Sequence, residues 1–481
     1  MKDSLKITGI GLLAVAGTSC TQQKTQRPNI VYILSDDLGM ESLGCYGGTS
    51  YETPYLDALA NQGIRFENMH SLPLSCPSRV QSLTGIYNDR NYVNFGYIND
   101  DENTFAHLAQ QAGYATAMVG KWQLGCSRDI PTKLGFDEWC LVQLEMYKEF
   151  DNETHTDRYA NTCVDNNRHY ELSLYGPDTF QDYAIDFIDR QAEAGKPFLL
   201  YYTTPLVHKP HTLTPDSEAW DLDYFNDYKN RCRNDVKNYP DMVKYLDKQV
   251  GELAQHLKEK GLWDNTIFIF TSDNGTCPNV TSQMSDGRAV RGGKGTSLWT
   301  ATHVPLIICW GDKIKEGRTS KRLVDLTDFT VTFADAMGIT PPAEWKLDGI
   351  SLYPELCGEK PLERELTLIH HNPLWPLDPS PLAARYAMTP EYKYYWDGRF
   401  YNYIEDPDEQ HPIDVNNARP EIQTIYAKLK AKVDEYPDWY PDKPGAERHG
   451  NYKSFYDFAP RVPFWIHNPR FEKNVKAPKD A

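Results

Sequence analysis

The sequence has no excess of basic residues. Its 481 residues include 50 Lys and Arg against 67 Asp and Glu, which gives a formal net charge of −17 at pH 7. Nucleic acid is therefore excluded as a partner, because no basic surplus is available to neutralise phosphates. An anionic substrate would need a local cluster of cations set within an acidic surface.

Long hydrophobic runs are also lacking. The apolar run nearest the N-terminus covers residues 7–17 and is too short to span a bilayer. It follows Lys2 and Lys6 and precedes Ser19 and Cys20, a pattern typical of an export signal. The boundary resembles a bacterial lipobox, although Gly17 stands where leucine is usual. We expect residues 1–19 to be a signal peptide.

Lipidation of Cys20 would then anchor the protein to a membrane, with residues 20–27 as a polar tether. This implies an exported protein of the periplasm or cell surface. Plain secretion and an uncleaved anchor are the alternatives.

Paired cysteine motifs are absent as well. Nine cysteines beyond Cys20 are scattered along the chain without any CxxC pair, which argues against a zinc site. We expect most of them to be small buried residues, with one or two disulfides as the alternative.

Short apolar runs alternate with helical patterns over the first three quarters of the chain. Residues 29–34 (NIVYIL) read as a buried strand, and four similar runs cover residues 115–119, 198–202, 266–270 and 304–309. Helices are predicted over residues 104–112, 179–194, 242–260 and 324–337. This alternation predicts an α/β domain whose ligands bind beyond the carboxyl ends of the strands.

The pattern of apolar and aromatic residues changes after about residue 362. Aromatic runs at residues 385–388, 393–396 and 400–404 predict an antiparallel meander, and residues 420–436 predict a helix. A chain of this length exceeds one ordinary core. We therefore expect one domain over residues 28–362 and a smaller subdomain over residues 363–481.

Residues 75–85 (SCPSRVQSLTG) form the most specific motif. They resemble the signature of type I sulfatases, C/S-x-P-S-R-x-x-x-L-T-G, with every fixed position filled. The alternative is an ordinary helix start capped by Ser78. The resemblance implies that a serine-type sulfatase-maturating enzyme oxidises Ser75 to formylglycine. The hydrate of that aldehyde attacks sulfur with one oxygen and expels sulfate with the other. Cys76 falls on a variable position.

The same resemblance implies a fold and a metal site. The fold is the alkaline-phosphatase-like α/β architecture, a large mixed sheet flanked by helices, with a smaller C-terminal subdomain of antiparallel sheet and helix. Asp36 and Asp37 (in DDLG), Asp273 and Asn274 (in SDNG) and Ser75 would hold one metal ion. This oxygen-only set suits Ca²⁺, with Mg²⁺ possible. Taken alone, each segment would more often be a turn or a helix cap.

Three cations would bind the sulfate group. Residues 113–125 (GYATAMVGKWQLG) resemble a second sulfatase signature that supplies Lys121, and residues 291–295 (RGGKG) resemble the loop that supplies Lys294. Arg79 lies in the first motif. The second motif departs from the family at Gln123, where histidine is usual. Glutamine cannot take a proton near neutral pH, which places the release of sulfate in question.

Residues 205–211 (PLVHKPH) resemble the segment whose histidine reaches the leaving group, which implies this role for His208. The sugar contacts belong to more variable segments, and packing at the domain junction is an equal alternative for some of them. The candidates are Gln123, His211, Arg291, His370, His371, Trp375 and Arg385.

The predicted function is hydrolysis of sulfate esters from a sulfated carbohydrate. Two alternatives remain open: a phosphate ester or diester hydrolase of the same superfamily, and a weakly active glycan-binding lipoprotein. The second alternative is motivated by Gln123.

Overall fold

The computed structural model describes residues 27–92, 95–125, 128–144, 158–159, 164–165, 175–311, 313–372 and 383–436. The predicted anchor Cys20 and the predicted sugar contact Trp375 lie outside these residues. No helix within these ranges combines the length and the apolar character needed to cross a lipid bilayer.

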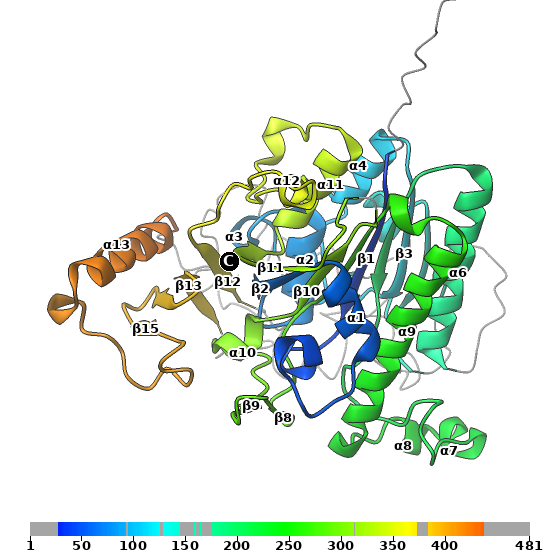
Figure 1. The fold of residues 1–481 in the computed structure, drawn as a ribbon, viewed down its shortest axis with the longest axis horizontal. Helices are drawn as coiled ribbons and strands as arrows, with labels where there is room; N and C mark the ends of the chain where they lie inside the picture. Colours follow the sequence, from blue (N-terminus) through cyan, green and yellow to red (C-terminus); the bar gives the residue numbers. More distant parts are fainter. Residues whose placement is uncertain are drawn as a thin grey trace, which may run out of the picture.

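A nine-stranded mixed sheet runs through the larger part of the described chain (Figure 1). The strand order is β11-β2-β10-β7-β1-β6-β3-β4-β5. The strands are β1 (Asn29–Ser35), β2 (Ile64–His70), β3 (Ala115–Lys121), β4 (Glu138–Val142), β5 (Val164–Asp165), β6 (Phe198–Thr203), β7 (Thr266–Ser272), β10 (Leu306–Cys309) and β11 (Arg318–Asp325). β10 is antiparallel to both of its neighbours, and β5 is antiparallel to β4. The other neighbouring pairs are parallel.

The central strands are buried on both faces. In β1, Ile30 and Tyr32 enter one hydrophobic core, whereas Val31 and Ile33 enter the other. A strand covered on both sides needs apolar side chains at every position, which explains its continuous apolar sequence. One core is covered by α2 (Ser75–Thr84), α4 (Phe105–Gln111) and α11 (Asp328–Met337), and the other by α1 (Pro54–Gln62), α6 (Gly176–Ala194) and α9 (Tyr239–Glu259).

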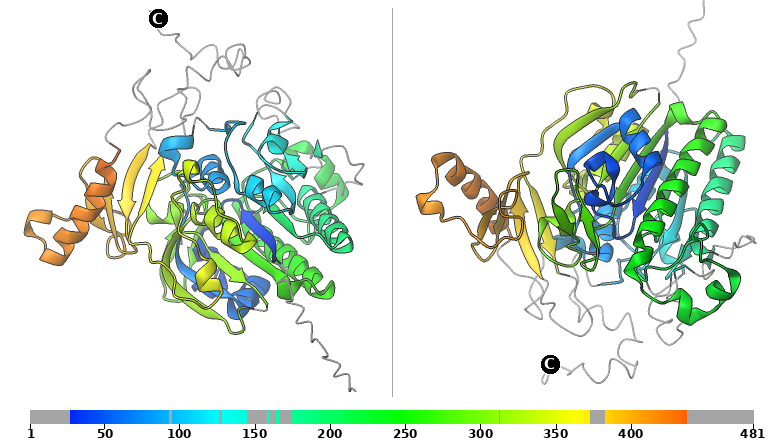
Figure 2. Two further views of the ribbon diagram at one scale, coloured as in Figure 1. Left: turned by 90° about the horizontal axis from the view of Figure 1, so that it is seen from above. Right: turned by 60° about the horizontal axis from the view of Figure 1, so that its bottom comes forward.

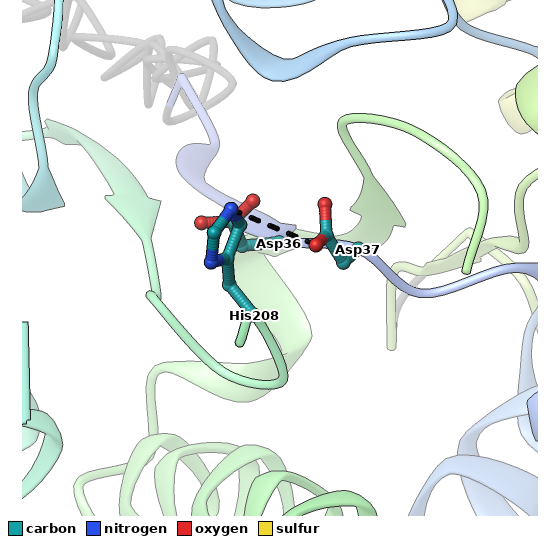
Figure 3. A group of neighbouring side chains, drawn as sticks. All are labelled: Asp36, Asp37 and His208. Carbon is teal, nitrogen blue, oxygen red and sulfur yellow. Dashed lines mark ion pairs between the residues drawn. The ribbon is translucent and has the colours of Figure 1, made fainter. Parts of the chain in front are cut away.

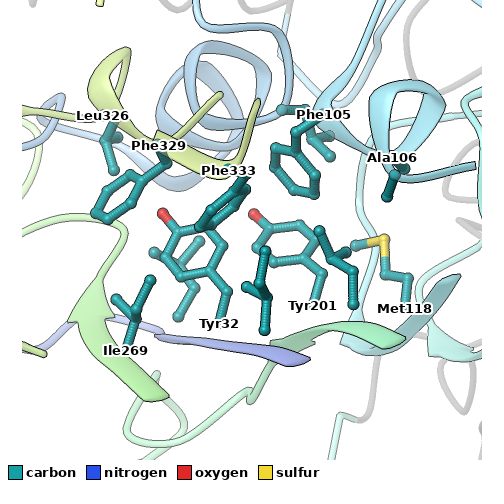
Figure 4. Close-up of a cluster of buried hydrophobic side chains, with 14 of the residues drawn as sticks. Tyr32, Phe105, Ala106, Met118, Tyr201, Ile269, Leu326, Phe329 and Phe333 are labelled. Atoms are coloured by element: carbon teal, nitrogen blue, oxygen red, sulfur yellow. The ribbon is translucent and has the colours of Figure 1, made fainter. Parts of the chain in front are cut away.

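Aromatic side chains fill the core on the α2 side (Figure 4). The ring of Tyr32 stacks on Tyr201 with 5.2 Å between centroids and lies 4.6 Å from the ring of Phe329. The Tyr32 hydroxyl also hydrogen-bonds to Ser82 of α2 at 2.9 Å. This buried bond ties β1 to α2, the helix that begins at Ser75.

A separate four-stranded antiparallel sheet follows the large one. It consists of β12 (Thr367–His371), β13 (Ala384–Met388), β14 (Tyr392–Tyr395) and β15 (Phe400–Asn402). Helix α13 (Pro420–Asp434) packs on β13 and β14, on the side away from the large sheet (Figure 2). The predicted meander and helix are confirmed. The domain boundary at residue 363 stays a prediction.

One prediction of secondary structure is wrong in its first residues. Residues 324–337 were expected to form a single helix, but β11 extends to Asp325 and α11 begins at Asp328. Val324 and Asp325 pair with β2 instead, opposite Met69 and His70. A short apolar run is compatible with a buried strand or with a helix. Here pairing with the neighbouring strand β2 stabilises the strand.

Candidate active site

The carboxyl ends of β1 and β7 bring the two acidic motifs together. The strands are parallel and in register, with Ser35 opposite Ser272, so the residues that follow them meet at one edge of the sheet. The backbone N–H of Asp37 donates to Asp273 Oδ1 at 3.2 Å. All four predicted metal ligands that follow these strands are buried: Asp36, Asp37, Asp273 and Asn274.

Ser75 joins this group from the first turn of α2. Its Oγ donates to Asp36 Oδ1 and to Asn274 Oδ1, both at 3.1 Å, and the residue is only 3% exposed. A helix N-terminus presents unpaired N–H groups and a positive dipole end, which favours negative charge at this position. The helix places Ser75 where an anion is stabilised.

Three cations pair with the three carboxylates. The contacts are Lys121 Nζ to Asp36 at 2.7 Å, Arg79 Nε to Asp273 at 3.4 Å and Lys294 Nζ to Asp37 at 2.5 Å. We call these cations, the four metal-ligand candidates and Ser75 the Ser75 cluster. It forms the local group of cations that an anionic substrate requires on a chain with a net charge of −17.

Burial and crowding shift the pKa values within the cluster. Burial raises the pKa of Asp273 to about 7, and the neighbouring Asp36 adds to the rise. Burial alone would also raise the pKa of Asp37, but His208 and Lys294 outweigh it and lower this pKa to about 2. Lys121 likewise holds the pKa of Asp36 well below its usual value against the effect of burial. Further positive charge would relieve the repulsion among these carboxylates.

His208 faces the two aspartates that follow β1 (Figure 3). Its Nε2 lies 3.6 Å from Asp37 Oδ2, and one ligand atom from each of Asp36, Asp37 and His208 falls within 4.8 Å of the others. Burial, with Arg158 as the next contribution, lowers the pKa of His208 well below its usual value. The ring is therefore neutral near pH 7 and carries one N–H.

Two residues at the site escaped the sequence analysis. Arg158 Nη1 contacts His208 Nδ1 and also donates to the Lys209 carbonyl oxygen at 3.2 Å. Arg158 belongs to no motif, so the sequence holds no signal for it. Cys277 donates from Sγ to Asp37 Oδ2 at 3.0 Å. Its place just after the SDNG motif was a signal that could have been used.

Glycine allows the loop of Lys294 to pack closely on the loop after β7. A Cβ atom on Gly292 would lie 2.3 Å from the Cys277 carbonyl oxygen, so a larger residue does not fit. The N–H of Lys294 donates to the Thr276 carbonyl oxygen at 3.0 Å. This packing directs the Lys294 side chain towards Asp37.

Gln123 and Asp37 hold unusual backbone conformations. Their φ values are +52° and +66°, in the left-handed region that residues other than glycine seldom adopt. Such conformations cost on the order of 1–3 kcal/mol each and gather at functional sites. The Gln123 carbonyl accepts a hydrogen bond from Cys76 Sγ at 3.3 Å, whereas its buried Oε1 has no partner among the described residues.

The other predicted sugar contacts lie in different surroundings. The buried His211 packs edge-on against the Tyr239 ring, with 5.2 Å between centroids. Arg385 Nε donates to His370 Nδ1 at 3.1 Å on the small sheet, where His371 is fully buried. Arg291 is exposed, at the end of the short strand β9 (Ala289–Arg291). Their role in binding a sugar stays a prediction.

Comparisons with known proteins show what the chain resembles in sequence and in fold. A family model described as Sulfatase matches residues 28–339. The chain is 31% identical over 371 residues to N-acetylgalactosamine-6-sulfatase of Canis lupus familiaris, covering 71% of this chain and 68% of that protein. It is 27% identical over 526 aligned residues to N-acetylglucosamine-6-O-sulfatase of Bacteroides thetaiotaomicron, covering 89% and 88%.

A solved structure shares the fold at lower identity. The phosphonate monoester hydrolase of Agrobacterium radiobacter superimposes with a TM-score of 0.61 at 20% identity, covering 85% of this chain and 96% of that one. The predicted architecture, a large mixed sheet between helices with a small antiparallel sheet beside it, is confirmed.

Proposed function

Because this chain belongs to the sulfatase family and is a sulfuric ester hydrolase of the alkaline-phosphatase-like fold, we propose that it removes sulfate from a sugar, with Ser75 as its formylglycine nucleophile. The observation that carries the proposal is the position of Ser75 Oγ. It lies 3.1 Å from two ligand candidates, within a cluster whose carboxylates pair with three buried or nearly buried cations.

Each residue of the Ser75 cluster has a role in this proposal. Lys121 and Lys294 bind sulfate oxygens and stabilise the charge that develops on them. Arg79 orients the Asp273 carboxylate. Conversion of Ser75 to formylglycine, by a serine-type maturating enzyme, would supply a geminal diol with one oxygen to attack sulfur and another to release sulfate.

We propose His208 as the donor to the leaving sugar oxygen. Arg158 Nη1 can only donate, so its contact with Nδ1 favours the neutral tautomer whose proton is on Nε2, the nitrogen on the Asp37 side. Arg158 thereby acts as a positioning residue. An N–H aimed at the ester oxygen helps a poor leaving group most.

The residues of the cluster fit a bound calcium ion, with magnesium as the alternative. Asp36, Asp37, Asp273 and Asn274 offer only oxygen donors, and hard cations prefer such sets. Burial, and then the neighbouring Asp36, raises the pKa of Asp273, and both effects disfavour a charged carboxylate that has no further cation beside it. A divalent cation here would neutralise the carboxylates and bind a sulfate oxygen.

The substrate we propose is a 6-O-sulfated N-acetylhexosamine in a glycan. The support is the pair of relatives, which are named for 6-sulfate groups on N-acetylgalactosamine and N-acetylglucosamine. Export through the signal peptide and anchoring at Cys20 belong to the same proposal, since sulfated glycans lie outside the cell. Replacing Cys20 with alanine should abolish incorporation of labelled fatty acid.

Mass spectrometry of the Ser75 peptide from the native host tests the nucleophile. We expect a mass lower by two hydrogen atoms than the serine form. Ser75→Ala should abolish turnover of 6-O-sulfated N-acetylgalactosamine, whereas Cys76→Ala should retain it. Full activity with unmodified Ser75, or faster turnover of an aryl phosphate than of the matching aryl sulfate, would refute the proposed function.

Calcium binding is tested by thermal unfolding, which does not depend on activity. A ligand held only by the folded state stabilises it by about 2.7 kcal/mol at a hundred times its dissociation constant. Chelation should therefore lower Tm, and Asp273→Asn should remove the response. The surface variant Asp189→Asn, whose carboxylate pairs with His256 and Lys260, should keep it. A Tm insensitive to calcium in the wild-type protein would contradict the metal site.

A further inference from the structure

A cavity of about 610 Å³ lies beside the loop that carries Lys294. One wall is the hairpin of β8 (Thr281–Gln283) and β9, which contributes Arg288 and Arg291. The opposite wall includes Trp299 and, from the turn after β15, Asp408. Figure 1 shows the hairpin beside α10 (Trp299–Thr302). Arginine, tryptophan and an acid in one hollow are groups that bind sugars and their charged substituents.

Arg291 is the cation of this cavity that lacks an ionic partner. Arg288 pairs with Asp286 at 2.8 Å. Arg291 donates from Nε to the Pro278 carbonyl oxygen at 2.7 Å, and no carboxylate among the described residues forms an ion pair with it. Its two terminal nitrogens remain able to bind an anion in the bidentate manner of arginine.

The walls of the cavity are joined by a buried hydrogen-bonded group. Lys393 Nζ donates to the Ser297 carbonyl oxygen at 2.8 Å and to Glu409 Oε1 at 2.5 Å. The Tyr395 hydroxyl donates to Glu409 Oε2 at 2.5 Å and lies 3.2 Å from the same Ser297 oxygen. We call these four residues the Lys393 clamp. It fixes the loop of residues 292–299 to the turn of Asp408, so the cavity is formed before any ligand arrives.

The cavity lies close to the site of sulfate hydrolysis. Arg291 and Lys294 are three residues apart, so their Cα atoms are at most about 11 Å from each other. Gly292 and Gly293 line the cavity, while the next residue reaches Asp37. The segment of residues 291–294 thus contributes both to the cavity and to the Ser75 cluster.

We propose that this cavity binds the sugar next to the one that loses sulfate, and that Arg291 binds an anionic group, carboxylate or sulfate, on that neighbour. Trp299 offers a face for the sugar ring, and Asp408 accepts from its hydroxyls. The inference rests on the proposed function, because it assumes a sulfated glycan at the Ser75 cluster.

The test compares four substrates that carry the same 6-O-sulfated N-acetylhexosamine. One is the monosaccharide, and three are disaccharides whose second sugar is a neutral hexose, a hexuronic acid or a sulfated hexose. In the wild-type enzyme we expect kcat/KM to be highest for the two anionic disaccharides. Arg291→Ala should reduce the ratio of their kcat/KM to that of the monosaccharide about tenfold, the effect of one charge-assisted hydrogen bond at a partly exposed site. Arg291→Lys should retain part of the preference.

Arg318→Ala is the matched control. Arg318 is also an exposed arginine, but it is the first residue of β11 and does not line the cavity. Loss of the preference for only one anionic disaccharide identifies the anion that Arg291 binds. A ratio unchanged in Arg291→Ala, or reduced equally for the neutral disaccharide, would overturn the inference. Failure of the proposed function is distinct, because all four substrates would then resist the wild-type enzyme. Calorimetric binding of the two anionic disaccharides that lack only the 6-O-sulfate, to wild type and to Arg291→Ala, then tests the cavity by itself, and equal affinities of the two proteins would overturn it.

Discussion

Two groups of buried charges in this molecule differ in how completely they are paired. In the Lys393 clamp, the ammonium group donates to a carbonyl and a carboxylate, and the other carboxylate oxygen receives a tyrosine hydroxyl. In and around the Ser75 cluster, buried atoms of the described residues remain without hydrogen-bond partners, among them Arg79 Nη2, Arg158 Nε and Gln123 Oε1.

This difference separates a structural charge from a functional one. Buried polar groups are normally satisfied, because an unsatisfied one costs about 1–3 kcal/mol. The clamp follows that rule and holds two parts of the fold together. The Ser75 cluster departs from it, and an unpaired donor such as Arg79 Nη2 can bind an oxygen of an anion that arrives later. The following substitutions test whether the two groups differ in this way.

The largest effect is expected at the functional group. His208→Ala should lower kcat for a sugar sulfate on the order of 10²–10³-fold, the range for loss of one hydrogen-bond donor to charge that develops in the transition state, because the neutral ring donates a hydrogen bond from Nε2. A nitrophenyl sulfate should lose far less, because its oxide leaves without help. Steady-state kinetics on both substrates measures the contrast.

Arg158→Gln should show the same contrast between leaving groups in weaker form, since Arg158 acts only by orienting the ring. Both variants should affect kcat more than KM. The control is His256→Ala, which alters a histidine paired with Asp189 on the surface. Equal losses on sugar and nitrophenyl sulfates would assign His208 a purely structural role.

The next effect concerns stability. Lys393→Met should destabilise the fold by about 3–5 kcal/mol, because it leaves Glu409 buried without a counter-ion. Burial lowers the pKa of Lys393, but the pairing with Glu409 opposes that effect. Urea unfolding measures the change in free energy.

Restoring neutrality should recover part of the loss, so Lys393→Met with Glu409→Leu should be more stable than Lys393→Met alone. Lys428→Met removes an exposed ion pair with Glu365 and should change stability little, because water and salt screen such a pair. If Lys393→Met and Lys428→Met unfold at the same urea concentration, the clamp is not the structural charge described here.

The strands of the large sheet show what the sequence could predict. Continuous apolar runs identified β1, β3, β6, β7 and β10, which lie among or beside the central strands. β2 (IRFENMH) was missed because it is only partly buried and carries polar residues at its centre. A continuous apolar run identifies a strand that is buried on both faces. A strand that is covered on only part of its length is harder to identify from the sequence. Strand order could not be predicted, because it depends on contacts between distant segments.

At the site, too, some residues could be predicted from the sequence and others could not. Residues of contiguous motifs could be predicted, and two of them from different motifs, Ser75 and Asn274, lie 3.1 Å apart. Arg158 could not, because its position beside His208 arises from a contact across 50 residues that no motif records. The cavity at Arg291 could not be predicted either. It depends on the Lys393 clamp, whose residues lie far apart in the sequence, between Ser297 and Glu409.

A third buried acidic group, the Glu41 carboxyl, predicts a pH effect. Burial raises the pKa of Glu41 from 4.5 to about 7. The folded protein therefore binds more protons than the unfolded chain between these values. The stability contributed by the protonated carboxyl is complete below pH 4.5 and is lost as pH rises through 7. The loss amounts to about 3 kcal/mol.

Glu41→Gln carries no charge and escapes this loss. The variant should thus gain on the wild-type protein between pH 5 and pH 8, by up to about 3 kcal/mol in urea unfolding. Glu52→Gln, at an exposed position, should run parallel to wild type. A difference between Glu41→Gln and wild type that stays constant with pH would show that Glu41 titrates alike in both states.

The smallest effect is expected from Gln123→His, which restores the residue usual in sulfatase motifs. Histidine is one of the few residues enriched at positive φ, so the conformation at +52° should accept it without new strain. An imidazole near neutral pH can take a proton that glutamine cannot. If the release of sulfate limits turnover, kcat should rise by up to about tenfold, with KM little changed. Gln123→Met provides the matched control, because it keeps the length of the side chain but removes its amide. A lower kcat together with a higher KM in Gln123→His would mean instead that the amide binds the sugar, and Gln123 would then belong with Arg291 among the residues that select the substrate.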